Sequence, residues 1–125
     1  MPIRSNEASL ELFRLTPRDL RRVERAIEYI QCNYSEKLSV EHIAMEVRLS
    51  KEKLQAGIQH KTKLTLHEYL VSVRIEKSKD LLTKTELPIK AIADSTGFKK
   101  AGHFCDVFKA LNSVTPSQFR FQFGE

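Results

Sequence analysis

The sequence predicts an all-α protein with seven helices, which form two helix-turn-helix subdomains joined by a long central helix. Two observations favour this fold class. Apolar residues recur every three or four positions along most of the chain, as on one face of an α-helix, and no stretch alternates as a β-strand does. A helix-turn-helix pattern also occurs twice, in residues 40–69 and again in residues 89–120.

The two copies match at almost constant spacing, which indicates the duplication of one supersecondary unit. Ile43 is 49 residues from Ile92, and Thr65 is 50 residues from Thr115. The extra residue falls just after the turn of the second copy, where a loop tolerates it. Apolar residues recur in any pair of helices, but an alanine also follows the isoleucine in both copies. The duplication therefore explains the match better than chance does.

The N-terminal residues, 1–16, show no clear periodicity and are predicted to form an arm or linker, although their apolar side chains could pack on the domain or on a neighbouring protein. The first helix should begin at Pro17. Thr16 suits the N-cap, proline suits the first helical position, and Asp19 brings negative charge to the positive end of the helix. This helix should end near Asn33.

The first subdomain is expected to span residues 17–64, with two further helices that begin at Ser39 and Ser50. Arg48 stands in the turn between these two helices, at the position that a glycine fills in the second copy. A left-handed backbone at Arg48 would cost about 1 kcal/mol.

The connecting segment, residues 65–84, should contain one long helix that begins at Leu66. Thr65 and Glu68 have the spacing of a capping box, in which the threonine caps a backbone N–H and the glutamate reaches back. A helix of about 18 residues is about 27 Å long. Successive major-groove faces of DNA lie about 34 Å apart, so this connector can hold two helix-turn-helix units roughly one turn apart. The agreement favours DNA binding.

The second subdomain is expected to span residues 85–125. Pro88 suits the first turn of its first helix, and Gly97 permits a left-handed turn after it. The next helix should run from about residue 100 to residue 111. Residues 115–118 have a second capping-box pattern and should open the last helix.

The composition limits the classes of protein to which this chain can belong. The 125 residues carry a formal net charge of +5, which agrees with an anionic partner but indicates one only weakly. No apolar run approaches the ~20 residues of a membrane span, and the N-terminus lacks the apolar core of a signal peptide. We therefore expect a cytoplasmic protein, located on the nucleoid, with no membrane partner.

An enzyme is not expected, nor a metal or another cofactor. The four histidines show no metal-ligand spacing, no nucleophile elbow is present, and no glycine-rich phosphate loop occurs. Cys32 and Cys105 lie far apart without the spacing of a zinc site or of a disulfide framework.

A chain of motifs at correct spacing points to one family. The first unit has Leu-Ser-x-x-x-Ile-Ala at residues 38–44. The most specific motifs are in the second unit: Ile-Ala at 92–93, Gly-Phe at 97–98, and Thr-Pro-Ser at 115–117. With these motifs, residues 21–120 resemble the DNA-binding domain of the AraC/XylS family of bacterial transcription regulators.

The resemblance implies two recognition helices, residues 50–61 and 100–111, that enter adjacent major grooves on one face of promoter DNA. It also leaves room for two further partners, RNA polymerase and a separate sensor or dimerisation domain outside this chain. The sequence departs from the family pattern, which usually has arginine where Ala56 and Asp106 stand. The family usually has glycine where Lys63 and Ser113 end the recognition helices.

On the first recognition helix, Gln55 is the best candidate base reader, because its amide can pair with adenine N6 and N7. The alternative is a solvated surface. The outward set is Lys51, Glu52, Gln55, Ala56 and Gln59. Lys51, Lys53, Lys61 and Lys63 are predicted either to contact phosphates, which position a protein without reading sequence, or to form a solvated face.

On the second recognition helix, the outward set is Lys99, Lys100, Ala101, Gly102, Cys105, Asp106 and Lys109. Its three lysines are the expected contacts to the DNA backbone. Asp106 could accept a hydrogen bond from cytosine N4, repel phosphate, or pair with Lys109, and we favour a plain surface role. The first lobe is therefore expected to read the sequence while the second anchors the protein.

Two alternatives remain open. Gly57 and Gly102 weaken the helices in which they lie. Glycine at these positions is explained either by a close approach of the backbone to DNA or by sequence divergence alone. The whole domain could also be a protein-interaction adaptor or anti-regulator with weak or no DNA binding, since arginine is absent at positions 56 and 106.

Overall fold

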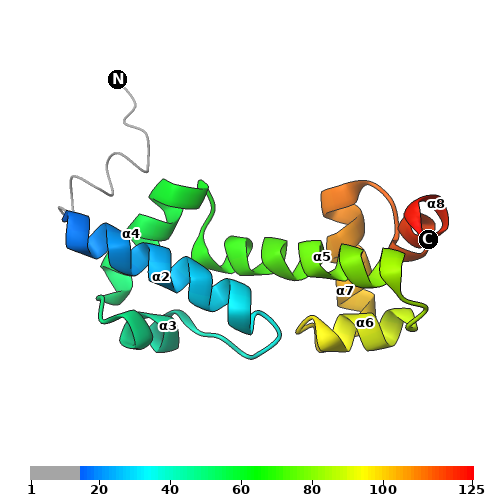
Figure 1. The fold of residues 1–125 in the computed structure, drawn as a ribbon, viewed down its shortest axis with the longest axis horizontal. Helices are drawn as coiled ribbons and strands as arrows, with labels where there is room; N and C mark the ends of the chain where they lie inside the picture. The colour runs from blue at the N-terminus through cyan, green and yellow to red at the C-terminus, as the bar shows by residue number, and fades with distance from the viewer. Residues whose placement is uncertain (1–14) are drawn as a thin grey trace, which may run out of the picture. The chain divides into compact units, whose positions relative to one another are not determined.

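The computed structural model of this chain describes residues 15–125, so most of the predicted N-terminal arm lies outside the described residues. Within residues 15–125 the protein forms seven α-helices and no β-strand (Figure 1), and the predicted all-α class is confirmed. The helices are α2 (Pro17–Asn33), α3 (Val40–Val47), α4 (Lys51–Thr62), α5 (Leu66–Lys84), α6 (Ile89–Ser95), α7 (Ala101–Asn112) and α8 (Pro116–Phe123).

The described chain divides into two compact units. Unit 1 contains the residues up to 33 together with residues 38–71, and unit 2 contains residues 34–37 and 72–125. The helix α5 contributes its first turns to unit 1 and the rest to unit 2. Its 19 residues correspond to a length of about 28 Å.

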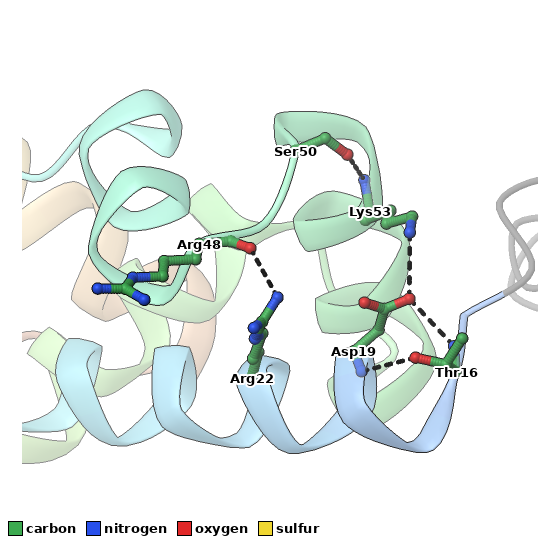
Figure 2. A network of polar contacts seen from close by, with 6 residues as sticks. All are labelled: Thr16, Asp19, Arg22, Arg48, Ser50 and Lys53. Atoms are coloured by element: carbon green, nitrogen blue, oxygen red, sulfur yellow. Dashed lines mark hydrogen bonds and ion pairs between the residues drawn. The ribbon is translucent and has the colours of Figure 1, made fainter.

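The start of α2 is fixed by a reciprocal pair of hydrogen bonds (Figure 2). The backbone N–H of Asp19 donates to Thr16 Oγ1 at 3.0 Å, and the backbone N–H of Thr16 donates to Asp19 Oδ2 at 3.1 Å. Two of the donors that a helix start leaves unpaired are thereby satisfied. The predicted cap is confirmed, and Asp19 takes the place that a glutamate usually has in a capping box.

The predicted caps of the later helices are also present. Ser39 and Ser50 accept backbone hydrogen bonds at the starts of α3 and α4. Thr65 and Glu68 exchange hydrogen bonds at the start of α5, and Thr115 and Gln118 do so at the start of α8. Pro88 was predicted in the first turn of α6, and it stands just before that turn, at the N-cap.

The two helix-turn-helix units repeat the same backbone geometry. In the turns, Arg48 has a φ of 59° and Gly97 a φ of 95°. The backbone N–H of Leu49 donates to the carbonyl of Ala44 at 3.0 Å. In unit 2, the backbone N–H of Phe98 donates to the equivalent carbonyl, that of Ala93, at 2.9 Å. Both α4 and α7 have 12 residues and end in a left-handed residue, Lys63 in one and Ser113 in the other. This agreement supports the duplication.

Unit 1 packs α2, α3 and α4 around one apolar core. Leu20 and Ile27, which the pattern puts on the buried face of α2, are only half-buried. The core comprises Val23, Ala26, Ile30, Ile43, Ala44, Val47, Leu54 and Ile58, with Leu66 and Leu70 of α5.

A ladder of aromatic rings in unit 2 joins the turn after α6 to α7 and α8. Rings of Phe98, Phe104, Phe108, Phe119 and Phe123 follow one another with centroid distances of 5.2, 5.8, 5.4 and 4.8 Å. Pairs of this kind contribute about 0.5–1.5 kcal/mol beyond the apolar area that they bury. Arg120 joins the last helix to the end of α5, because its guanidinium donates to the carbonyls of Leu82 and Thr85.

The turn of unit 2 lies on a half-buried arginine, Arg74. Arg74 donates through Nε to the carbonyl of Tyr34 at 2.7 Å and through Nη2 to the carbonyl of Glu36 at 2.8 Å. A Cβ at Gly97 would lie 2.7 Å from Arg74 Nε. Glycine is therefore required here both by the left-handed backbone and by the space that Arg74 occupies.

Candidate nucleic-acid interface

The outer face of α4 presents polar side chains from a rigid helix. Lys51, Glu52 and Gln55 are exposed, and Gln59 is half-buried. The opposite face of α4 is fixed in the core by Leu54 and Ile58, both fully buried. The first recognition helix is therefore held from behind, with the predicted base reader Gln55 on its open side.

One residue of the outward set is not on this surface. Ala56 is only 4% exposed, so its predicted outward position is wrong. Leu54, Gly57 and Ile58 of the same helix are buried as well, so the packed face of α4 extends to Ala56. Spacing along the sequence gives the angular position of a residue on a helix, but not how wide the packed face is.

Three of the predicted phosphate-binding lysines make contacts within unit 1. Lys53 Nζ lies 3.2 Å from Asp19 Oδ2 (Figure 2), and Lys61 Nζ lies 2.8 Å from Glu24 Oε1. Lys63 Nζ donates to the carbonyl of His60 at 3.0 Å. Thus Lys53 and Lys61 lie on the side of α4 that contacts α2, whereas Lys51 lies on the outer face. The contacts of these four lysines to phosphate stay a prediction.

These ion pairs act on two carboxyl groups of α2. The pKa of Asp19 is lowered first by the backbone N–H of Thr16 and then by Lys53, against an opposing effect of burial. The pKa of Glu24 is lowered chiefly by the hydrogen bond from Lys61. Both carboxylates are thus held in the charged form beside α4.

Gly57 in α4 is explained by packing inside unit 1, and not by close approach to DNA or by divergence, the two alternatives that the sequence left open. A Cβ at Gly57 would lie 2.3 Å from Val23 Cγ2, so α2 packs directly on the helix backbone at this position. Gly57 faces α2, away from Gln55, and close approach to DNA does not account for it. Nothing lies within 4 Å of a Cβ at Gly102, so this glycine is not required by packing.

The outer face of α7 presents small residues as well as charged ones. Gly102, Asp106 and Lys109 are exposed, Ala101 and Cys105 are half-buried, and Lys99 and Lys100 are exposed just before the helix. The aspartate and Lys109 form no ion pair among those found in residues 15–125. Ala101 and Gly102 have no functional group that could bind DNA. The lysines are therefore the main groups on this face that could contact it.

A groove that the spacing of motifs did not predict runs beside α4. It has a volume of about 470 Å³ and brings the start of α5 beside the two glutamines of the recognition helix. Its lining residues are Leu38, Val40, Gln55, Gln59, Thr65, Leu66, His67 and Leu70. The capping box at Thr65 could have indicated a helix start here, but not its position beside Gln55.

Among residues 15–125, no group of three or more metal-ligating side chains is close enough to hold an ion, and no helix is long and apolar enough to cross a membrane.

Comparisons with known proteins identify the fold. The helix-turn-helix domain family matches residues 43–122. An AraC-type DNA-binding domain from Chromobacterium violaceum has a TM-score of 0.80 and 24% identity, and the match covers 84% of this chain and 94% of the other. The C-terminal domain of AraT, a response regulator from Geobacillus stearothermophilus, has a TM-score of 0.79 and 33% identity, with 90% of both chains covered.

The chain belongs to the AraC/XylS family. Its domain is a DNA-binding module of transcription regulators, and the predicted family is confirmed. The Msm operon regulatory protein of Streptococcus mutans is 33% identical over 98 residues, which cover 78% of this chain. This AraC/XylS chain spans 35% of the length of that relative and 60% of the length of another curated relative.

Proposed function

We propose that this AraC/XylS chain binds double-stranded promoter DNA in a sequence-specific way, with α4 and α7 in adjacent major grooves of one duplex. The observation that carries the proposal is the open face of α4, where Gln55 and Lys51 are exposed on a helix that is capped by Ser50 and anchored by buried residues. An α-helix of this kind fits the major groove, and a glutamine amide can recognise adenine there.

The two recognition helices have different roles in this proposal. The α4 helix reads bases through Gln55, with Glu52 and Gln59 beside it. The α7 helix anchors the protein through lysines, because most of its outer positions lack a group that distinguishes base pairs. The length of α5, about 28 Å, is compatible with two units spaced by about one turn of DNA.

The proposal extends to the protein's role in the cell. We propose a regulator that acts on the nucleoid without catalysis and whose further contacts include RNA polymerase and a separate sensor or dimerisation domain. The relatives are named as transcription regulators, which supports the regulatory role, and one of them, AdaA of Bacillus subtilis, is named as a DNA repair enzyme as well.

A second candidate function is a protein-interaction adaptor with weak or no DNA binding. Asp106 favours it, since an exposed carboxylate at the centre of the outer face of α7 repels phosphate. Because DNA affinity comes largely from phosphate contacts, a lost arginine at this position weakens the anchor of the second unit.

Fluorescence anisotropy with mixed genomic duplexes at low and at higher salt distinguishes the two functions. A regulator should bind with steep salt dependence and a sequence preference. Gln55→Ala should relax specificity at one base pair, whereas Lys100→Ala should weaken binding to all duplexes alike and flatten the salt slope. No binding even at low salt would support the adaptor, and the reverse pattern of the two variants would overturn the roles of α4 and α7.

A further inference from the structure

Four arginines lie close together on α2, and none of them belongs to the predicted DNA-contacting residues. Of the seven arginines in residues 15–125, four lie between residues 18 and 25, whereas the cations on the outer faces of α4 and α7 are all lysines. Arg18, Arg21 and Arg25 are exposed and share one face of the helix. We name these three residues the arginine stripe.

The arginine stripe is placed where the helix itself disfavours positive charge. Arg18 lies in the first turn of α2, at the positive end of the helix dipole. Arg21, Arg22 and Arg25 follow at spacings of three and four residues, at which like charges on a helix repel each other. Local helix stability does not explain the three exposed arginines in these turns, so an external anion is the simplest reason for them.

The nearby carboxylates compensate the arginine stripe only in part. Glu24 accepts from Lys61 of α4 at 2.8 Å, and its pKa is lowered chiefly by that hydrogen bond and only weakly by Arg21. Arg22 has a separate role, because its Nη1 donates to the carbonyl of Arg48 in the turn (Figure 2). Within residues 15–125, the three exposed arginines form no hydrogen bond or ion pair, and they line a shallow depression in which four arginines outnumber two glutamates, Glu24 and Glu28.

The direction of the arginine stripe separates it from the base-reading face. On α4, Lys53 and Gly57 contact α2, and Gln55 lies two residues from each, or about 200° around the helix. On α2, Asp19 and Val23 contact α4, and Arg21 likewise lies two residues from each. The base reader and the arginine stripe therefore point away from each other, on opposite outer sides of the α2–α4 pair.

We propose that the arginine stripe is a docking surface for an acidic segment of a second protein, which can bind while α4 contacts DNA. Arginine suits this partner because its planar guanidinium donates two parallel hydrogen bonds to a carboxylate. A duplex bound to the outer face of α4 lies on the other side of unit 1. This part of the argument rests on the proposed function, since it takes α4 as the DNA-binding helix.

The test uses the full chain and a fluorescein-labelled oligo-glutamate peptide, titrated with and without a saturating unlabelled duplex. The triple variant Arg18→Gln, Arg21→Gln, Arg25→Gln removes the arginine stripe, and glutamine keeps a similar helix propensity. The control variant removes three exposed lysines elsewhere, with the same change in net charge: Lys37→Gln, Lys77→Gln and Lys84→Gln.

We expect the DNA-saturated protein to bind the peptide, and the arginine variant to weaken this binding about tenfold while the lysine variant changes it little. The melting temperature of the arginine variant should be equal or higher, because cations leave the helix start. Arg21→Gln alone should show a smaller loss in the same direction.

Three results would overturn the inference. Equal losses in the arginine and lysine variants would indicate attraction by net charge only. A loss of duplex affinity in the arginine variant as large as the loss of peptide affinity would assign the arginine stripe to DNA phosphates. Release of the peptide by the duplex would show a shared surface. If no duplex binds, the proposed function fails, but the comparison of variants without DNA still tests the docking surface.

Discussion

The same substitution in the two recognition helices should have opposite effects on stability. Gly57→Ala in α4 adds a Cβ that would lie 2.3 Å from Val23 Cγ2, 3.2 Å from its Cγ1 and 3.3 Å from its Cβ. Val23 is fully buried, and a β-branched side chain in a helix has essentially one rotamer, so it cannot move aside cheaply. Gly102→Ala in α7 adds a Cβ that meets nothing within 4 Å.

The magnitudes follow from two opposing effects. Alanine is more stable than glycine in a helix by about 0.5–1 kcal/mol, and this gain applies to both variants. Overpacking a core costs about 1–3 kcal/mol, and this cost applies only to Gly57→Ala. We therefore expect Gly57→Ala to lower the free energy of unfolding by about 1 kcal/mol, and by no more than about 2.5 kcal/mol, and Gly102→Ala to raise it by about 0.5–1 kcal/mol.

Urea unfolding followed by circular dichroism measures both free energies. A third variant isolates the contact, because Val23→Ala removes the two methyl groups that a Cβ at residue 57 would meet. In the double variant the two changes should offset each other by about 1 kcal/mol or more relative to their sum. If Gly57→Ala is as stabilising as Gly102→Ala, or if the double variant is additive, the close packing of α2 on α4 is refuted.

Two further substitutions test the turn and the first cap. Gly97→Ala should destabilise the protein by about 2 kcal/mol, since φ is 95° and the new Cβ would meet Arg74, whereas Arg48→Gly at the matching turn should be neutral or slightly stabilising. Melting temperatures compare these two variants, and equal values would contradict the role of the turn. Asp19→Asn should cost about 1 kcal/mol at neutral pH. Because folding lowers the pKa of Asp19, its contribution is complete above its unfolded pKa and declines as the pH falls through about 4. Thermal unfolding across pH measures this, and a difference that does not depend on pH would exclude the carboxylate as its source.

Local features of this fold could be predicted from the sequence because they depend on neighbouring residues. The caps at Thr16, Ser50 and Thr115 each involve a hydrogen bond to a residue three positions away. The turn at Gly97 depends on the one residue type that adopts a left-handed backbone without strain. The family was indicated by resemblance, through short residue motifs such as Gly-Phe at 97–98 and Thr-Pro-Ser at 115–117.

Long-range contacts could not be predicted in this way. Lys53 meets Asp19 across 34 residues, and Arg74 meets the carbonyl of Tyr34 across 40 residues. No local pattern distinguishes these side chains from exposed ones. The burial of Ala56 was missed because angular position on a helix does not show how far the packed face of α4 extends. The roles of Gln55 and of the lysines depend on DNA, and they stay predictions.

The central claim is that α4 and α7 occupy the major groove of a single duplex, with α4 reading its sequence. Hydroxyl-radical footprinting on a selected duplex tests this most directly. We expect two protected tracts on one face of the DNA, with centres about 10 base pairs apart, and a base preference in one tract that Gln55→Ala relaxes. A single protected tract, or two tracts on opposite faces of the duplex, would contradict the account.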